Sequence, residues 1–171
     1  MPIPESPSAS DRAAVRAQLG RPPRGEYAIA ARGACGLPAV IRTAPRLSDG
    51  TPFPTLWYLT CPTVVAAVST LESTGWLQAQ TQRLAADPGL AADYRLAHQR
   101  YIAERDRIAV VPELAGISAG GMPDRVKCGH ALVAHSLAVG PGVNPIGDAA
   151  VAELREVGVW PCRHPCVDAE G

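Results

Sequence analysis

Three segments in the first part of the chain have the apolar pattern of short β-strands. Residues 27–32 (YAIAAR), 38–44 (PAVIRTA) and 51–60 (TPFPTLWYLT) are rich in β-branched and aromatic residues, which favour strands. The segments between them contain the Gly, Pro and Asp residues that are typical of turns. We therefore predict a three-stranded antiparallel meander. Because so small a sheet is marginally stable alone, one of its faces must pack against helices.

Apolar residues at helical spacing predict those helices. A short helix is expected to begin at Ser10, which can act as its N-cap. The sequence thus predicts an α+β fold in which a small three-stranded antiparallel sheet packs against four or five helices. Residues 1–9, rich in Pro and Ser, are expected to form a disordered tail, and residues 10–171 a single α+β domain. The longer helices are predicted over residues 62–75, 87–111, 123–139 and 147–158.

The composition argues against several classes of protein. Sixteen basic and sixteen acidic residues leave no net charge, and aromatic residues make up only 5% of the chain, so nucleic acid is not an expected partner. The N-terminus has neither a basic leader nor an apolar run, and the apolar stretch ALVAHSLAV is about half as long as a membrane span. We expect a cytoplasmic protein without a membrane segment.

The five cysteines are the main candidates for chemistry, and in a reducing compartment they are expected to be free thiols or metal ligands. Cys128 and His130 are a suggestive C-x-H pair. If both were helical, however, their side chains would point about 200° apart. Cys128 and His135 would share a helix face but lie about 10 Å apart, too far for one metal ion. Only one of the three can then be a ligand, unless Cys128 precedes the helix or the backbone distorts there.

The other cysteines lie where predicted elements end, which is where metal ligands are commonly found. Four thiolates gathered from such positions can hold zinc or an iron–sulfur cluster. The alternative is that the thiols are unrelated and pack as small hydrophobic groups. The candidate ligands are Cys35, Cys61, Cys128 and Cys162, with Cys166, His130 and His164 as alternatives.

Cys128 is also a candidate nucleophile. A thiol in the first turns of a helix, with Arg125 and Lys127 nearby in sequence, has a lowered pKa. A base would have to be brought to it by the fold, and His98 and His164 are the candidates. In the alternative interpretation, His130 lies on an apolar stripe of the predicted helix and is a hydrogen-bonded core residue.

An anion site is a third interpretation of the same region. Gly120 and Gly121 lead into the predicted helix start near Pro123, and exposed backbone amides at such a start bind phosphate or carboxylate. Arg125 and Lys127 would assist, whereas Asp124 places negative charge in the same turn. The spacing matches neither a P-loop nor a dinucleotide fingerprint, and an ordinary loop explains the glycines equally well.

Four stretches resemble a known family: QLGRPPRG, PRLSDGTPFPTLWYLTCP, ISAGGMPDRVKC-x-HALVAH and GPGVNPIGD. They are similar to the domain of unknown function 501 family, from mainly high-GC Gram-positive bacteria, over about Val15 to Cys162. The resemblance implies no particular activity. It implies cysteines at positions 35, 61 and 128 and in a C-terminal Pro-Cys pair, whereas Gly33 stands where relatives often carry another cysteine. Members are often encoded near cell-division and polyphosphate genes.

The leading hypothesis is a thiolate metal-binding domain with a zinc or iron–sulfur centre, made by Cys35, Cys61, Cys128 and either Cys162 or Cys166. One alternative is a Cys128-dependent hydrolase or transferase acting on a phosphate or carboxylate substrate. Another is an interaction module for a protein partner in cell division or polyphosphate metabolism.

Overall fold

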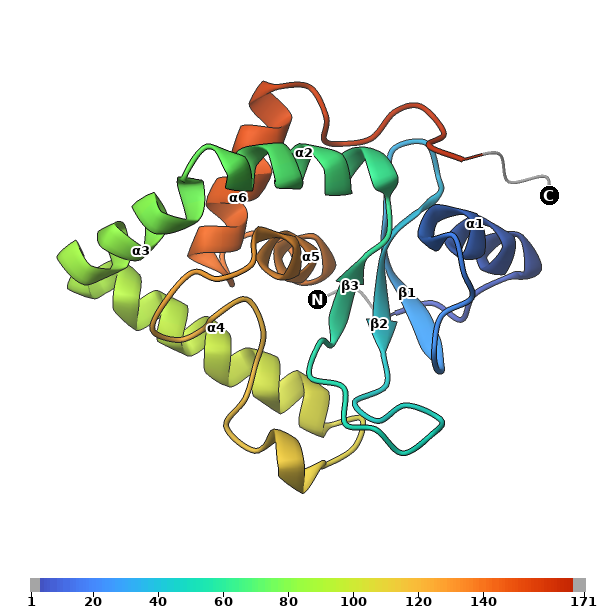
Figure 1. The fold of residues 1–171 in the computed structure, drawn as a ribbon, viewed down its shortest axis with the longest axis horizontal. Helices are drawn as coiled ribbons and strands as arrows, with labels where there is room; N and C mark the ends of the chain where they lie inside the picture. The colour runs from blue at the N-terminus through green and yellow to red at the C-terminus, as the bar shows by residue number, and fades with distance from the viewer. Residues whose placement is uncertain (1–3, 168–171) are drawn as a thin grey trace.

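The computed structural model describes residues 4–167, in which a small antiparallel sheet stands among helices (Figure 1). The α+β prediction with a three-stranded antiparallel sheet is confirmed. Along the chain the elements are α1 (Ala9–Leu19), β1 (Tyr27–Arg32), β2 (Pro38–Thr43), β3 (Trp57–Leu59), α2 (Pro62–Ser73), α3 (Trp76–Ala86), α4 (Pro88–Asp106), a 3-10 turn (Pro112–Leu114), α5 (Gly129–Val139) and α6 (Pro145–Glu156).

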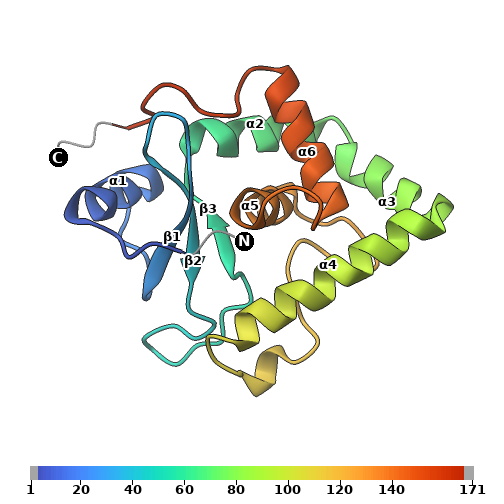
Figure 2. The ribbon, with the colours of Figure 1, turned by 180° about the vertical axis from the view of Figure 1, so that it is seen from behind.

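The sheet has the order β1-β2-β3, and its two faces are buried against different helices. Ile29 of β1 and Ile41 of β2 face one another across the strand pair and pack with Val15 of α1. The alternate residues of β2 and β3, including Val40, join the main core with α2 to α6. Figures 1 and 2 show α1 alone on one side of the sheet and α5 directly against the other.

Helix α5 lies at the centre of the main core. It contacts β3, α2 and α6, and seven of its eleven residues are buried. A helix buried on nearly every side needs apolar residues all around, which the run GHALVAHSLAV supplies. The first residues of α5 are therefore held in place by the elements that pack around the helix.

Several predicted boundaries differ from the structure. Six α-helices, rather than four or five, are present in residues 4–167. The missed helix is α3, a largely polar segment that buries only Trp76, Gln80 and Leu84, one residue per turn. The predicted helix over 87–111 ends at Asp106.

The N-terminal segment makes defined contacts where the sequence predicted a disordered tail over 1–9. Glu5 forms a β-bridge with Ile29, and Ser8, not Ser10, caps α1 in a reciprocal capping box with Asp11. Residues 1–3 of the predicted tail lie outside the described residues. No helix within residues 4–167 combines the length and the apolar character needed to cross a bilayer.

His135 of α5 is a polar group buried at the heart of the core. Its ring stacks on Trp57 at 4.7 Å between centroids and meets Tyr101 edge-on at 5.3 Å. The Oδ1 of Asn144 accepts from the amide of Gly147, so the Nδ2 of Asn144 donates to His135 Nδ1 at 3.0 Å. His135 is therefore neutral with its proton on Nε2, and burial lowers its pKa to about 3.

This buried imidazole predicts an acid-sensitive core. The unfolded chain binds a proton at His135 below its ordinary pKa of about 6.5, whereas the folded chain does not, so stability falls as pH drops below that value. In His135→Phe, the loss of unfolding free energy between pH 7.5 and pH 5.5 should be smaller than in the wild type by about 1.4 kcal/mol. Urea denaturation at the two pH values measures this. An unchanged pH dependence would contradict the assignment.

Candidate functional site

The loop before α5 turns back on itself and delays the start of the helix. The carbonyl of Gly120 accepts from the amides of Lys127 at 2.7 Å and Cys128 at 3.3 Å. Gly120 has φ +73°, and a Cβ there would lie 2.4 Å from the Leu132 side chain, so only glycine fits. The helix predicted from Pro123 therefore begins at Gly129, with Cys128 as its extended N-cap at φ −147° and ψ 110°.

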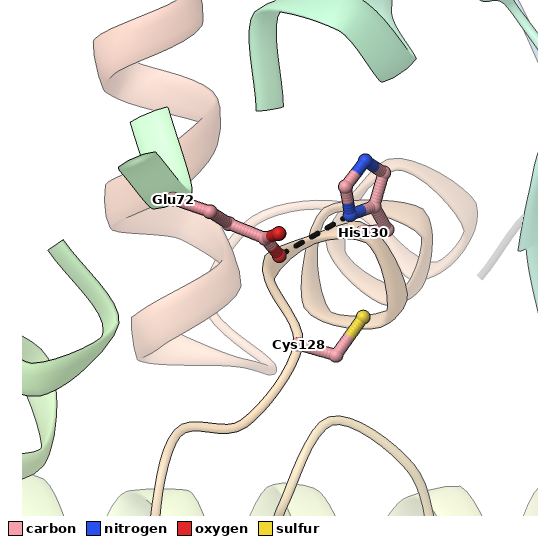
Figure 3. Close-up of side chains that lie close together, drawn as sticks. All are labelled: Glu72, Cys128 and His130. Atoms are coloured by element: carbon pink, nitrogen blue, oxygen red, sulfur yellow. Dashed lines mark hydrogen bonds and ion pairs between the residues drawn. The ribbon is translucent and has the colours of Figure 1, made fainter. Parts of the chain in front are cut away.

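This late start places Cys128 outside the helical geometry that would separate it from His130. The Cys128 sulfur, a ring nitrogen of His130 and a carboxylate oxygen of Glu72 all lie within 4.8 Å of one another. Figure 3 shows Glu72 reaching from α2 toward the two side chains at the start of α5. Sequence reasoning missed Glu72, because nothing in the local pattern of α2 indicates that its last turn meets residue 130.

The hydrogen bonds of His130 determine which ring nitrogen carries a proton. Nε2 lies 3.2 Å from the carbonyl oxygen of Val65 and 3.2 Å from Oγ of Ser69. The Ser69 hydroxyl already donates to the Val65 carbonyl at 3.0 Å, so both neighbours act as acceptors toward Nε2. Nε2 therefore carries a hydrogen, and in a neutral ring Nδ1 is an acceptor.

His130 Nδ1 faces Glu72 Oε1 at 3.2 Å, and a carboxylate oxygen can only accept. The amide of Gly129 donates to the same oxygen at 2.6 Å, which fixes the carboxylate in place. Two acceptors so close to each other and to the Cys128 sulfur repel unless a positive charge lies between them. The position calls for a proton or a metal cation.

The pKa shifts of the group have the same origin. The hydrogen bond with His130 is the main cause that lowers the pKa of Cys128, and it outweighs burial, which raises it. The pKa of His130 is raised chiefly by Cys128 and further by the charge of Glu72. The thiolate form of Cys128 and the protonated form of His130 thus favour each other.

A pocket of about 260 Å³ adjoins the group. Cys128 and His130 line it, whereas Glu72 does not. The remaining lining is mostly apolar and aromatic, which suits a ligand with an apolar part. It consists of Thr55, Trp57, Tyr58, Leu59, Val65 and Ala131.

The residues predicted to bind an anion are not arranged around an open helix start. The carbonyls of Gly120 and Gly121 accept hydrogen bonds within the loop, and the first amide of α5 donates to Glu72. The carboxylate of Glu72 thus occupies the place an external anion would take. Arg125 and Lys127 are exposed and do not line the pocket.

The four other cysteines gather at the end of the sheet from which α2 begins. The Cys61 thiol neighbours those of Cys162 and Cys166; burial raises its pKa to about 12, and the two thiols act in the same direction. Cys162 in turn neighbours Cys35. Cys128 belongs to the Glu72 group instead, so the predicted set is divided between two places.

His98 and His164, predicted as candidate bases for Cys128, are not part of the Glu72 group. His98 Nδ1 hydrogen-bonds Ser118 Oγ at 2.8 Å. The backbone carbonyl of His164 accepts from the Cys162 thiol at 3.3 Å. Within residues 4–167, His130 is the imidazole that lies beside Cys128.

The chain matches the model of one protein family, whose description reads "Protein of unknown function (DUF501)", over residues 29–152. The match contains Glu72, Cys128 and His130 and ends before Cys162. No curated protein and no solved structure matches the chain.

The capping contact of Glu72 can be tested separately from metal binding. In the presence of a chelator, Glu72→Ala should lower the free energy of unfolding by about 1 kcal/mol, because the amide of Gly129 loses its acceptor. Glu72→Gln keeps an acceptor oxygen and should lose less. Chemical denaturation of the two variants provides the comparison, and equal stability of the wild type and Glu72→Ala would contradict the contact.

Proposed function

The chain belongs to the DUF501 family of proteins of unknown function, and we propose that it is a zinc protein whose metal is bound by Glu72, Cys128 and His130. The observation that carries the proposal is the pairing of two acceptors, His130 Nδ1 and Glu72 Oε1, beside the Cys128 sulfur. Imidazole, carboxylate and thiolate are the ligands that zinc takes in proteins.

The surroundings of His130 fit a histidine that binds a metal through Nδ1. A histidine that binds a metal through one nitrogen usually donates its other N–H to a carbonyl or carboxylate. His130 does so, since Nε2 donates toward Val65 O and Ser69 Oγ. This second set of contacts orients the ring with Nδ1 facing Glu72.

Three protein ligands are the usual set of a catalytic zinc site, in which the fourth position is open. Cys128 and His130 line the apolar pocket, so we expect an open position to face it. A zinc ion held by these residues would supply a Lewis acid that can polarise a carbonyl or phosphoryl oxygen. The class of reaction this supports is hydrolysis of a small substrate with an apolar part bound against Trp57 and Leu59.

Cobalt(II) replacement tests the ligand set directly. Cobalt-loaded protein should show the visible bands of a tetrahedral site with a thiolate ligand, and the Cys128→Ser variant should lose the thiolate contribution of this site. Glu72→Gln should bind zinc at least tenfold more weakly, whereas the matched control Glu153→Gln, an exposed carboxylate of α6, should bind it normally. Unchanged zinc affinity in both Cys128→Ser and Glu72→Gln would overturn the proposal.

A thiol-dependent enzyme is the second candidate, and the position of Cys128 and His130 together on the pocket wall favours it. In this case a proton takes the place of the metal. The substrate would be held by apolar contacts, because Arg125 and Lys127 do not reach the pocket.

Alkylation separates the two candidates. If zinc binds, iodoacetamide should label Cys128 rapidly only after chelation, as mass mapping of the labelled cysteine would show. Rapid labelling of protein that contains no metal as purified, unaffected by added zinc, would favour the enzyme over the zinc site.

A further inference from the structure

The four cysteines outside the Glu72 group form a second cluster, the tail cluster, made of Cys35, Cys61, Cys162 and Cys166. Three separate parts of the chain contribute to it. Cys35 lies in the β1–β2 turn, Cys61 is the N-cap of α2, and Cys162 and Cys166 belong to the segment after α6. Figures 1 and 2 both show this last segment crossing the end of the sheet beside the β1–β2 turn.

Backbone contacts join the tail to the turn at the cluster. The amide of Cys35 donates to the carbonyl of Cys162 at 2.9 Å. A Cβ on Gly33 would lie 3.2 Å from the Cys35 sulfur and 3.3 Å from the Cys162 Cβ, so these two side chains converge on one point. Cys61 and Cys162 are 2% and 5% exposed, and Cys35 and Cys166 pack against the same core.

Two of the sulfurs lie beside a group that favours a thiolate, a hydrogen-bond donor at Cys166 and a helix start at Cys61. The Nε2 of Gln18 donates to the Cys166 sulfur at 3.4 Å. Cys61 is the N-cap of α2, where the helix dipole favours negative charge. Thiols that pack only as small hydrophobic groups do not need such donors, whereas metal-bound thiolates commonly have them.

We propose that Cys35, Cys61, Cys162 and Cys166 bind a structural zinc ion, separate from the Glu72 site, that fastens the C-terminal segment to the sheet and to α2. Four thiolates fill the tetrahedral shell of zinc and leave no open position. Zinc–sulfur bonds of about 2.3 Å put the sulfurs about 3.8 Å apart. No three of the cluster's sulfurs lie within 4.8 Å of one another, so zinc binding would have to bring the sulfurs closer together.

Zinc content of full-length protein tests this site independently of the Glu72 site. The wild type should hold two zinc ions per chain by mass spectrometry of metals, Cys128→Ser one, Cys166→Ser one, and the double variant none. If Cys166→Ser keeps the wild-type content, the tail cluster is not a zinc site, whatever happens at Glu72. If wild type and Cys128→Ser each hold one ion and Cys166→Ser none, the tail site stands and the zinc site at Glu72 falls.

Tail protection gives a second readout that does not depend on counting metals. Trypsin should cleave after the exposed Arg163 about tenfold more slowly when zinc is bound. Cys128→Ser should keep this protection, and Cys166→Ser should lose it without unfolding, as circular dichroism would verify. A visible iron–sulfur absorption band would overturn the zinc assignment, and so would a mass two hydrogens lighter, which indicates a disulfide.

Discussion

The position at which α5 begins is the constraint on which the candidate site depends. The carbonyl of Gly120 binds the amides of Lys127 and Cys128, and Leu132 packs so closely on Gly120 that no side chain fits there. The chain is thereby held in a loop until Cys128, which stays extended. Had the helix begun earlier, Cys128 and His130 would point in nearly opposite directions. Because it begins at Gly129, both can meet Glu72.

The second determinant is the burial of α5 among β3, α2 and α6. The core holds this helix on several sides, so its first residues approach α2 in one register. Val65 and Ser69, one helical turn apart on α2, bind one nitrogen of the His130 ring, and Glu72 faces the other. A single face of α2 thus orients the ring and supplies a charged partner. The resulting arrangement has more acceptors than donors, and this imbalance is what a cation corrects.

The fold could be predicted from the sequence further than the site could. Apolar runs and turn residues located the three strands, because each strand needs buried side chains at known intervals. The same signals did not predict α3, because only one residue per turn of that helix is buried and so sparse a pattern is hard to recognise. Cys128 and His130 could be singled out by residue type. Their relative position depends on a loop that is closed by backbone contacts of Gly120, and the local sequence does not indicate these contacts. Glu72 could not be found, because its role arises only when α2 packs on α5.

The protonation state of the His130 ring tests the central claim most directly. Nitrogen-15 NMR of the zinc-loaded, full-length protein observes the two ring nitrogens separately. A metal between His130 and Glu72 predicts a proton on Nε2 and none on Nδ1 at every pH at which the protein is folded and zinc-bound. A proton on Nδ1 of His130 in that protein, or a proton missing from Nε2, would contradict the account.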